Sequence, residues 1–215
     1  MGKLRGLLIV LAGAVGLLAL VPAVSAASTP WTLYNYNSSG NTIVPTATDS
    51  TATTASFDFA SGVYTGALTT NAKALTGDLT NRTMSATFSV TNMTLGAYFL
   101  DQNNGGCSAG PTVRLYFTSA GTGSSGQEFY TTFWWSNPVA VTLTNNGSGV
   151  VTAPLTPANW SDWNGQPGSV VPDAFSAAVS KVLSVGLSFG GGCFFENGVT
   201  TSDGSGTFNL THFSD

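Results

Sequence analysis

Alternation of apolar and polar residues is the feature of this sequence that most limits its fold. From Met84 to Val90 every second residue is apolar, and the residues between are Ser or Thr. Val113 to Thr118 and Phe129 to Trp135 alternate in a similar way. Successive side chains of a strand point to opposite faces of a sheet, so a period of two predicts strands with one face in a core. The chain is therefore predicted to form antiparallel sheets.

Short apolar runs between Gly, Asn, Pro and Ser predict further strands. We expect them at 31–36, 57–59, 64–69, 95–100, 139–143, 150–155, 182–189 and 207–213. The Ser- and Thr-rich segment 38–55 is expected to be an irregular loop or edge, and Asn145 to Gly147 predicts a hairpin turn. Helical spacing occurs at 172–182, where Phe175, Val179 and Val182 stand at i, i+4 and i+7.

The predicted fold is all-β: a single antiparallel β-sandwich of the jelly-roll kind, with one short helix near 172–182. Short strands without a βαβ rhythm favour such a sandwich. Charged residues make up only 7% of the chain, and Ser, Thr, Asn and Gly, which are poor helix formers, supply most of the polarity. Neither a repeat nor a linker divides residues 27–215, so we expect one domain there.

Residues 1–26 have the pattern of a signal peptide. Lys3 and Arg5 form a positive start, an apolar run extends from Leu7 to Leu20, and small residues at 24–26 offer a cleavage site after Ala26. An uncleaved membrane anchor is the alternative, but the apolar run is short for a span. The mature chain of about 189 residues is therefore expected to be secreted and extracellular, with no membrane contact after cleavage.

The charge of the mature chain argues against two classes of partner. Without Lys3 and Arg5, four basic side chains remain against ten acidic ones, a net charge of about −6. No cluster of Lys or Arg occurs anywhere. Nucleic acids and anionic membranes are therefore not expected as partners.

Cys107 and Cys193 are the two cysteines of the chain. In an exported protein such a pair predicts one disulfide, and a bridge closing about 87 residues is worth roughly 4–5 kcal/mol in the chain-entropy model. Two Cys and one His do not make a zinc signature, and the scattered Asp residues form no calcium loop. No metal or other cofactor is predicted.

The stretch GLSFGGGCFFENG at 186–198 contains G-x-S-x-G, the pattern of a hydrolase nucleophile elbow. Asp203 and His212 follow Ser188 in the order of an α/β-hydrolase triad. An elbow needs a helix directly after its strand, however, and Gly-Gly-Cys-Phe-Phe is not helical. Ser188 is therefore interpreted as an outward-facing strand residue, and the glycines as a bend or bulge.

Two glutamates offer a different chemistry. Glu128 and Glu196 are the only ones in the chain, and glycoside hydrolysis needs a pair of carboxylates. A small jelly-roll glycanase using this pair is the enzyme alternative. The structural alternative is that Glu128 pairs with Arg114 on an exposed face and that Glu196 occupies a turn with Asn197 and Gly198.

Aromatic residues point to ligand binding instead. If Phe129, Phe133 and Trp135 face the core, then Tyr130 and Trp134 lie on the outer face. Alternation likewise leaves Tyr116 outside, beside an Arg114–Glu128 pair. Aromatic rings suit the C–H faces of sugars, and charged side chains suit their hydroxyls.

A second possible platform is the polar loop at 159–165, with Trp160 and Trp163. The alternative is that either tryptophan folds back to cap the core.

The C-terminal half carries a resemblance to a known group. FWWSNP at 133–138, NWSDWNGQ at 159–166, AFSAAVSKV at 174–182, VGLSFGGGCFFENGV at 185–199 and GSGTFNLTHF at 204–213 resemble secreted bacterial jelly-roll proteins of the galactose-binding-domain type. These are similar to carbohydrate-binding modules. The resemblance implies a β-sandwich whose last strand is GTFNLTHF, and it transfers no binding residues.

These observations predict a secreted, non-catalytic glycan-binding module or lectin-like protein. Its partner would be a polysaccharide or a cell-surface glycan. Besides the glycanase, a structural matrix protein that self-associates through its uncharged Ser- and Thr-rich surface is an alternative.

Overall fold

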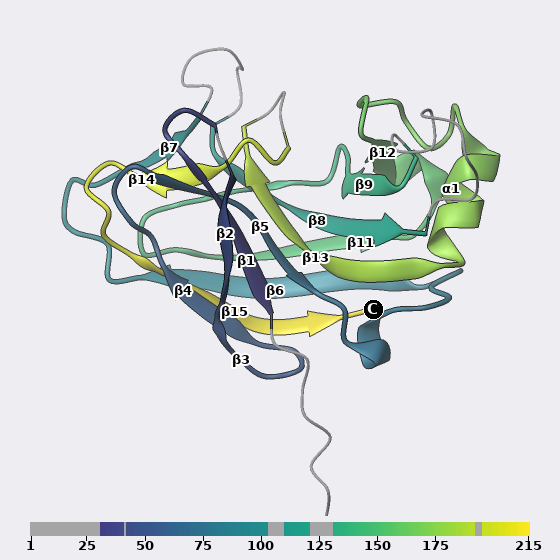
Figure 1. The fold of residues 1–215 in the computed structure, drawn as a ribbon, viewed down its shortest axis with the longest axis horizontal. Helices are drawn as coiled ribbons and strands as arrows, with labels where there is room; N and C mark the ends of the chain where they lie inside the picture. The colour runs from purple at the N-terminus through teal and green to yellow at the C-terminus, as the bar shows by residue number, and fades with distance from the viewer. Residues whose placement is uncertain (1–30, 41, 103–109, 121–130, 192–194) are drawn as a thin grey trace, which may run out of the picture.

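The computed structural model describes residues 31–40, 42–102, 110–120, 131–191 and 195–215, with backbone alone at 42–47. Two antiparallel sheets pack face to face around one core (Figure 1). This confirms the predicted all-β sandwich. The predicted signal peptide lies outside the described residues, as do Cys107, Cys193, Glu128 and Tyr130.

The larger sheet has ten strands, and seven of them form one continuous path. In spatial order these are β12 (Trp160–Asp162), β9 (Phe133–Ser136), β8 (Thr112–Ser119), β13 (Val182–Gly190), β5 (Val63–Thr70), β1 (Thr32–Asn37) and β2 (Thr42–Ala47). Three short strands complete it: β10 (Val141–Thr142) pairs with β8, and β14 (Val199–Thr201) pairs with β5 and with β7 (Phe99–Asp101).

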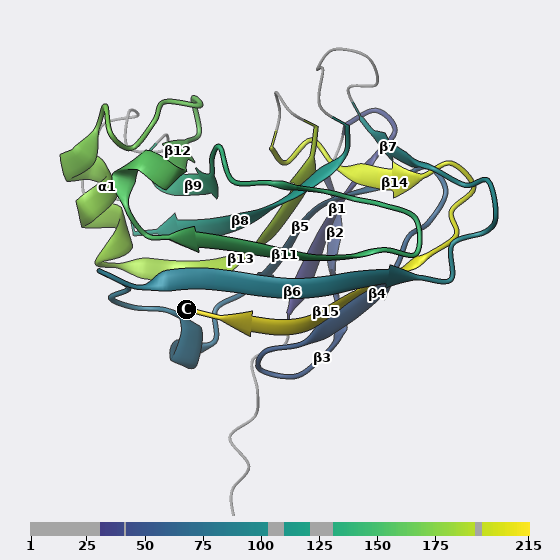
Figure 2. The same cartoon turned by 180° about the vertical axis from the view of Figure 1, so that it is seen from behind.

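The smaller sheet has five strands and faces the viewer in Figure 2. Its order is β11 (Ser148–Pro154), β6 (Thr83–Thr91), β15 (Thr207–Ser214), β4 (Ala55–Asp58) and β3 (Asp49–Ser50). The helical segments are η1 (Lys73–Leu75), η2 (Pro157–Asn159) and α1 (Pro172–Val179). The chain passes repeatedly from one sheet to the other, as jelly-roll strands do.

Period-two alternation determines which side chains form the core. In β6 the four apolar residues Met84, Ala86, Phe88 and Val90 are buried, and the Ser and Thr residues between them are more exposed. Residues 113, 115 and 117 of β8 and residues 185, 187 and 189 of β13 face the same core. The inward set predicted for these three strands is confirmed.

Helix α1 closes one end of the core, beside β9 and β12 (Figure 1). The ring of Phe175 lies 5.1 Å from that of Trp134 and 6.2 Å from that of Phe117, measured between centroids. The helix ends at Val179 rather than at the predicted 182. Val182 exchanges two backbone hydrogen bonds with Gly77 and belongs to β13, so pairing ends the helix early.

Segment 38–55, predicted as an irregular loop or edge, contains β2 and β3, which are edge strands of the two sheets. Two other local predictions are wrong. The strand expected at 95–100 is reduced to β7. The Asn145–Gly147 turn does not form a hairpin, because β10 pairs with β8 while β11 pairs with β6. The turn instead connects the two sheets, and the side-chain amide of Asn146 accepts from the backbone N–H of Met93 at 2.9 Å and donates to its carbonyl at 3.2 Å.

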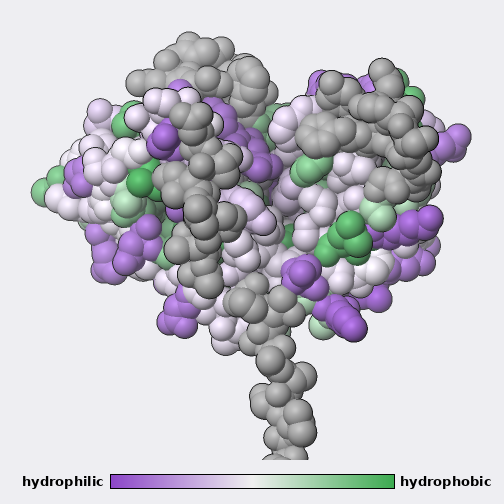
Figure 3. Space-filling view, viewed as in Figure 1, coloured by the Kyte–Doolittle hydropathy of each residue, from purple (hydrophilic) through white to green (hydrophobic). Residues whose placement is uncertain are grey.

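The described surface is mostly polar, with scattered apolar residues (Figure 3). Its exposed large hydrophobic side chains are Tyr34, Leu95, Tyr98, Val150, Trp163, Val170 and Leu183. Within the part of the chain that the structure describes, no helix has the length and apolarity needed to cross a membrane.

Candidate ligand-binding groove

An excursion of the chain places a carboxylate over the outer face of the larger sheet. Strands β13 and β14 both pair with β5: Ser188 lies opposite Ala67, and Val199 opposite Thr65. The partners Ala67 and Thr65 are two positions apart on β5, whereas Ser188 and Val199 are eleven positions apart in the sequence. The chain between β13 and β14 therefore leaves the sheet. The backbone N–H of Gly198 donates to the carbonyl of Phe189 at 3.0 Å and closes the excursion.

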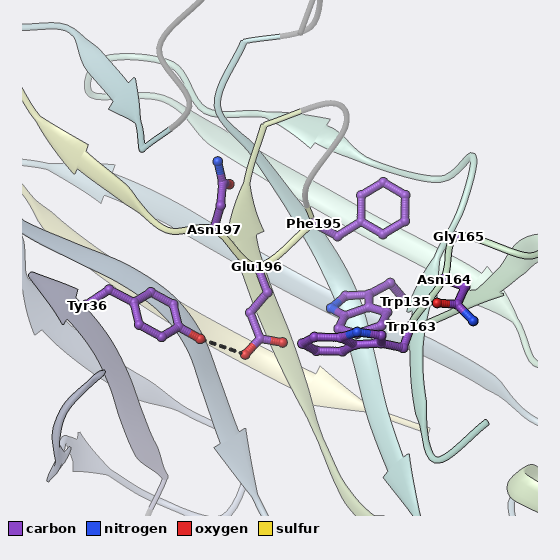
Figure 4. Close-up of a pocket in the computed structure, with 8 residues that line it drawn as sticks. All are labelled: Tyr36, Trp135, Trp163, Asn164, Gly165, Phe195, Glu196 and Asn197. Carbon is purple, nitrogen blue, oxygen red and sulfur yellow. Dashed lines mark hydrogen bonds between the residues drawn. The ribbon is translucent and has the colours of Figure 1, made fainter. Parts of the chain in front are cut away.

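The side chain of Glu196 extends from this excursion and is surrounded by aromatic side chains. Its carboxyl group lies between the phenol of Tyr36 on one side and the indoles of Trp135 and Trp163 on the other (Figure 4). The Tyr36 hydroxyl donates a hydrogen bond of 3.1 Å to Oε1 of Glu196. The side chain of Asn197 points away from this group, and its Oδ1 accepts from the backbone of Gly191 at 3.0 Å.

The aromatic side chains around Glu196 form one contiguous cluster. The ring of Trp135 is central, with centroid distances of 5.5 Å to Trp163, 5.5 Å to Tyr116 and 6.2 Å to Phe195. Phe133 completes the cluster at 5.5 Å from Trp163. Such distances are typical of favourable aromatic pairs, so these rings hold one another in place.

Burial changes the proton affinity of the groups in this cluster. It raises the pKa of Glu196 to about 7, despite the opposing effects of the Tyr36 hydroxyl and the Trp135 indole N–H. The pKa of Tyr36 is raised by burial and by Glu196, and that of Tyr116 by burial first and by Glu196 second. A neutral carboxyl group is thus present in part at neutral pH.

Two polar atoms next to each other have no hydrogen-bond partner among the described residues. These are Oε2 of Glu196 and Nε1 of Trp135, and both are buried. The indole N–H is near enough to favour the carboxylate, but the pair does not reach hydrogen-bond geometry. Both atoms are shielded from solvent, so the indole N–H interacts with the carboxyl group itself and stabilises its charged form.

Two adjacent cavities meet at Glu196. The first, which we call the indole pocket, has a volume of about 410 Å³ and is lined by Tyr36, Trp135, Trp163, Asn164, Gly165, Phe195, Glu196 and Asn197. The second, the hydroxyl pocket, has a volume of about 330 Å³ and is lined by Tyr34, Ala67, Thr69, Tyr116, Thr118, Phe133, Ser184 and Glu196. Together they form the groove, and both volumes suit small ligands.

Two of the predicted binding residues belong to the core instead. Trp134 is 0% exposed, stacks against Phe117 and donates from Nε1 to the carbonyl of Thr131 at 2.8 Å. Trp160 is equally buried, lies 5.0 Å from Phe117 and donates to the carbonyl of Pro154 at 2.9 Å. The predicted outward orientation of Trp134 and the platform at Trp160 are therefore wrong.

The other predicted residues have different positions. Tyr116 and Trp163 line the groove, and Trp163 is 46% exposed. Arg114 is not on an exposed face, because it is 6% exposed, donates to the carbonyls of Ser136 and Val139, and lies 4.3 Å from the ring centre of Phe195. Its predicted partner Glu128 and the predicted Tyr130 are outside the described residues.

The sequence analysis missed five aromatic residues of the groove: Tyr34, Tyr36, Phe133, Trp135 and Phe195. Trp135 was predicted inward because three consecutive aromatic residues at 133–135 carry no alternation that distinguishes the two faces. Tyr34 and Tyr36 alternate with asparagines in YNYN, a pattern that indicates a strand with aromatic residues on one face and polar residues on the other. This alternation could have identified both tyrosines as candidate binding residues.

The G-x-S-x-G motif has a structural explanation. A Cβ at Gly186 would overlap the carbonyl oxygen of Leu68, so close approach of β5 requires glycine there. Ser188 is a strand residue, as predicted, and the next described element after its strand is β14, not a helix. His212 lies in the other sheet, on β15, so the hydrolase triad is not assembled. Among the described residues, no group of three or more His, Cys, Asp or Glu side chains suits a metal ion.

Comparison with known proteins gives no relative. No protein-family model matches the chain, and neither curated sequences nor solved structures yield a match.

Proposed function

We propose that this protein is a secreted, non-catalytic glycan-binding module that holds a polysaccharide or cell-surface glycan in the groove around Glu196. One observation carries the proposal: the exposed Trp163 and the rings of Trp135 and Tyr36 line a cavity of about 410 Å³ beside the carboxyl group of Glu196. The amide of Asn164 lines the same cavity and suits the hydroxyls of a sugar, which both donate and accept hydrogen bonds.

The arrangement of the rings around the carboxyl group of Glu196 supports the same ligand class. Trp163 is exposed at one side of the groove, and Trp135 and Tyr36 flank the carboxyl group (Figure 4). Flat apolar rings with polar groups between them match a sugar, whose C–H faces are apolar and whose rim carries hydroxyls. The signal-like segment 1–26 supports secretion, and the resemblance to galactose-binding-type modules supports glycan binding.

Trp163→Ala tests the site. A glycan array first identifies a ligand, and titration calorimetry then compares variants. Trp163→Ala is expected to weaken binding roughly tenfold or more, because an exposed ring that stacks on a sugar is removed. Tyr98→Ala is the control, because Tyr98 is 58% exposed and lines neither pocket. Equal affinity of both variants and the native protein would place the ligand elsewhere.

Hydrolysis is the second candidate, because Glu196 has the environment of a general acid. Burial raises its pKa to about 7, and the groove passes on both sides of it. Cleavage needs a second carboxylate or base to activate water. Glu196 is the only carboxylate among the described residues that line the two pockets, whereas several aromatic rings line them, and this aromatic lining favours binding.

Release of reducing ends separates the two candidates. We expect the native protein to bind the glycan identified on the array without releasing reducing sugar above a heat-denatured control. Release that is lost in Glu196→Gln would establish the glycanase instead. Absence of both binding and release, together with concentration-dependent assembly in ultracentrifugation, would support a matrix protein.

A further inference from the structure

We infer that the groove binds a neutral oligosaccharide of at least two sugar units, which lies across Glu196 and occupies the indole pocket and the hydroxyl pocket together. This inference rests on the proposed function and adds to it the length and the charge of the ligand.

The length follows from the way the pockets join. Glu196 lines both, so its carboxyl group marks the junction of two cavities of about 410 and 330 Å³. A single sugar placed there fills at most one cavity, whereas a chain continues into the other.

The hydroxyl pocket has the form of a subsite for a further sugar. Small polar side chains from three adjacent strands line it: Thr69 of β5, Ser184 of β13 and Thr118 of β8. The hydroxyls of Ser184 and Thr118 share a 2.6 Å hydrogen bond and retain further lone pairs for a ligand.

Aromatic rings stand on both sides of these hydroxyls. Tyr34 comes from β1 and Phe133 from β9, four inter-strand steps apart, or about 19 Å. Each pocket thus combines aromatic rings, which suit the C–H faces of a sugar, with polar groups that suit its hydroxyls.

Neutrality follows from the charges around the groove. Within the described parts of the chain, Glu196 is the only Asp, Glu, Lys or Arg that lines either pocket. Arg114 is near, but it is buried against Phe195 and donates to two backbone carbonyls. A carboxylate or sulfate on the ligand would therefore meet Glu196 and find no cation among the lining residues, so uronic acids and sulfated sugars are disfavoured.

The test is a chain-length series measured by titration calorimetry. The probes are the monosaccharide to tetrasaccharide forms of the neutral glycan identified on the array, together with uronic-acid oligomers of the same lengths. The affinity is expected to increase at least tenfold from the monosaccharide to the trisaccharide. Uronic-acid oligomers are expected to bind at least tenfold more weakly than neutral ones.

A blocking variant locates the second subsite. Ser184→Tyr fills the hydroxyl pocket and is expected to remove the tenfold gain in affinity of the trisaccharide over the monosaccharide. Leu183→Tyr is the matched control and is expected to keep that gain, since Leu183 is adjacent, 55% exposed and lines neither pocket. If Ser184→Tyr does not fold, Tyr34→Ala serves instead and is expected to reduce the same gain.

The outcomes separate the inference from the function. A monosaccharide that binds as tightly as the trisaccharide, or tighter binding of uronic acids, would overturn the inference and leave glycan binding intact. No binding of any saccharide would overturn the proposed function itself.

Discussion

Replacing Trp134 by alanine is expected to lower the free energy of unfolding by about 3–5 kcal/mol. The side chain is fully buried between Phe117 and Phe175, where α1 closes the end of the core. Alanine leaves a cavity that the two packed sheets cannot fill, and the carbonyl of Thr131 loses the indole N–H that donates to it at 2.8 Å.

Urea denaturation followed by circular dichroism measures this change. Trp163→Ala is the control, because the same residue type is 46% exposed there and its loss is expected to cost only about 1–2 kcal/mol. Loss of Trp134 is thus expected to lower mainly the free energy of unfolding, and loss of Trp163 mainly the affinity for glycan. A Trp134→Ala protein of native stability that no longer binds glycan would show that the facing of β9 is the reverse of that described.

Stability is expected to fall as the pH rises from about 4.5 to 7, because of Glu196. Its pKa is about 7 in the folded protein against an ordinary value of 4.5, so the folded state binds the proton more tightly than the unfolded state does. The stabilisation is complete below pH 4.5 and is lost as the pH passes through the folded pKa. The difference corresponds to roughly 3 kcal/mol, because one pKa unit is about 1.4 kcal/mol.

Glu196→Gln isolates this contribution. Glutamine resembles the neutral acid, so the variant and the native protein are expected to be about equally stable near pH 4, and the variant more stable by up to about 3 kcal/mol at pH 8. Tyr36 and Tyr116 face Glu196, but their raised pKa values keep them neutral over this range. Burial also raises the pKa of Asp162, which is common to both proteins and cancels in the difference. A stability difference that does not change with pH would contradict the assignment.

The fold was largely predictable because alternation is a local signal. Strands β6, β8 and β13 follow from residues two positions apart, and their inward faces agree with the prediction. The prediction of inward and outward faces failed where apolar and polar residues do not alternate. The run FWWS of β9 is apolar on both faces, one packed on the core and the other on the aromatic cluster, so its facing was predicted the wrong way round.

The groove depends on contacts that no local pattern encodes. Tyr36 and Glu196 are 160 positions apart and meet because β1 and β13 both flank β5. Glu196 was recognised as a possible catalytic residue from its rarity, and its position in a turn was expected. That the turn lies over the outer face of the sheet follows from strand pairing alone.

The interruption between β13 and β14 has a consequence for how such a protein diversifies. Both ends of the excursion are fixed to the same strand, β5, so residues can be added to it or removed without altering the pairing register of the sheet. The segment that supplies Phe195 and Glu196 can therefore vary in length and sequence while the strand pairing around it stays the same. New ligand preferences can be selected there, or built by design, while the two packed sheets that give the protein its stability stay unchanged.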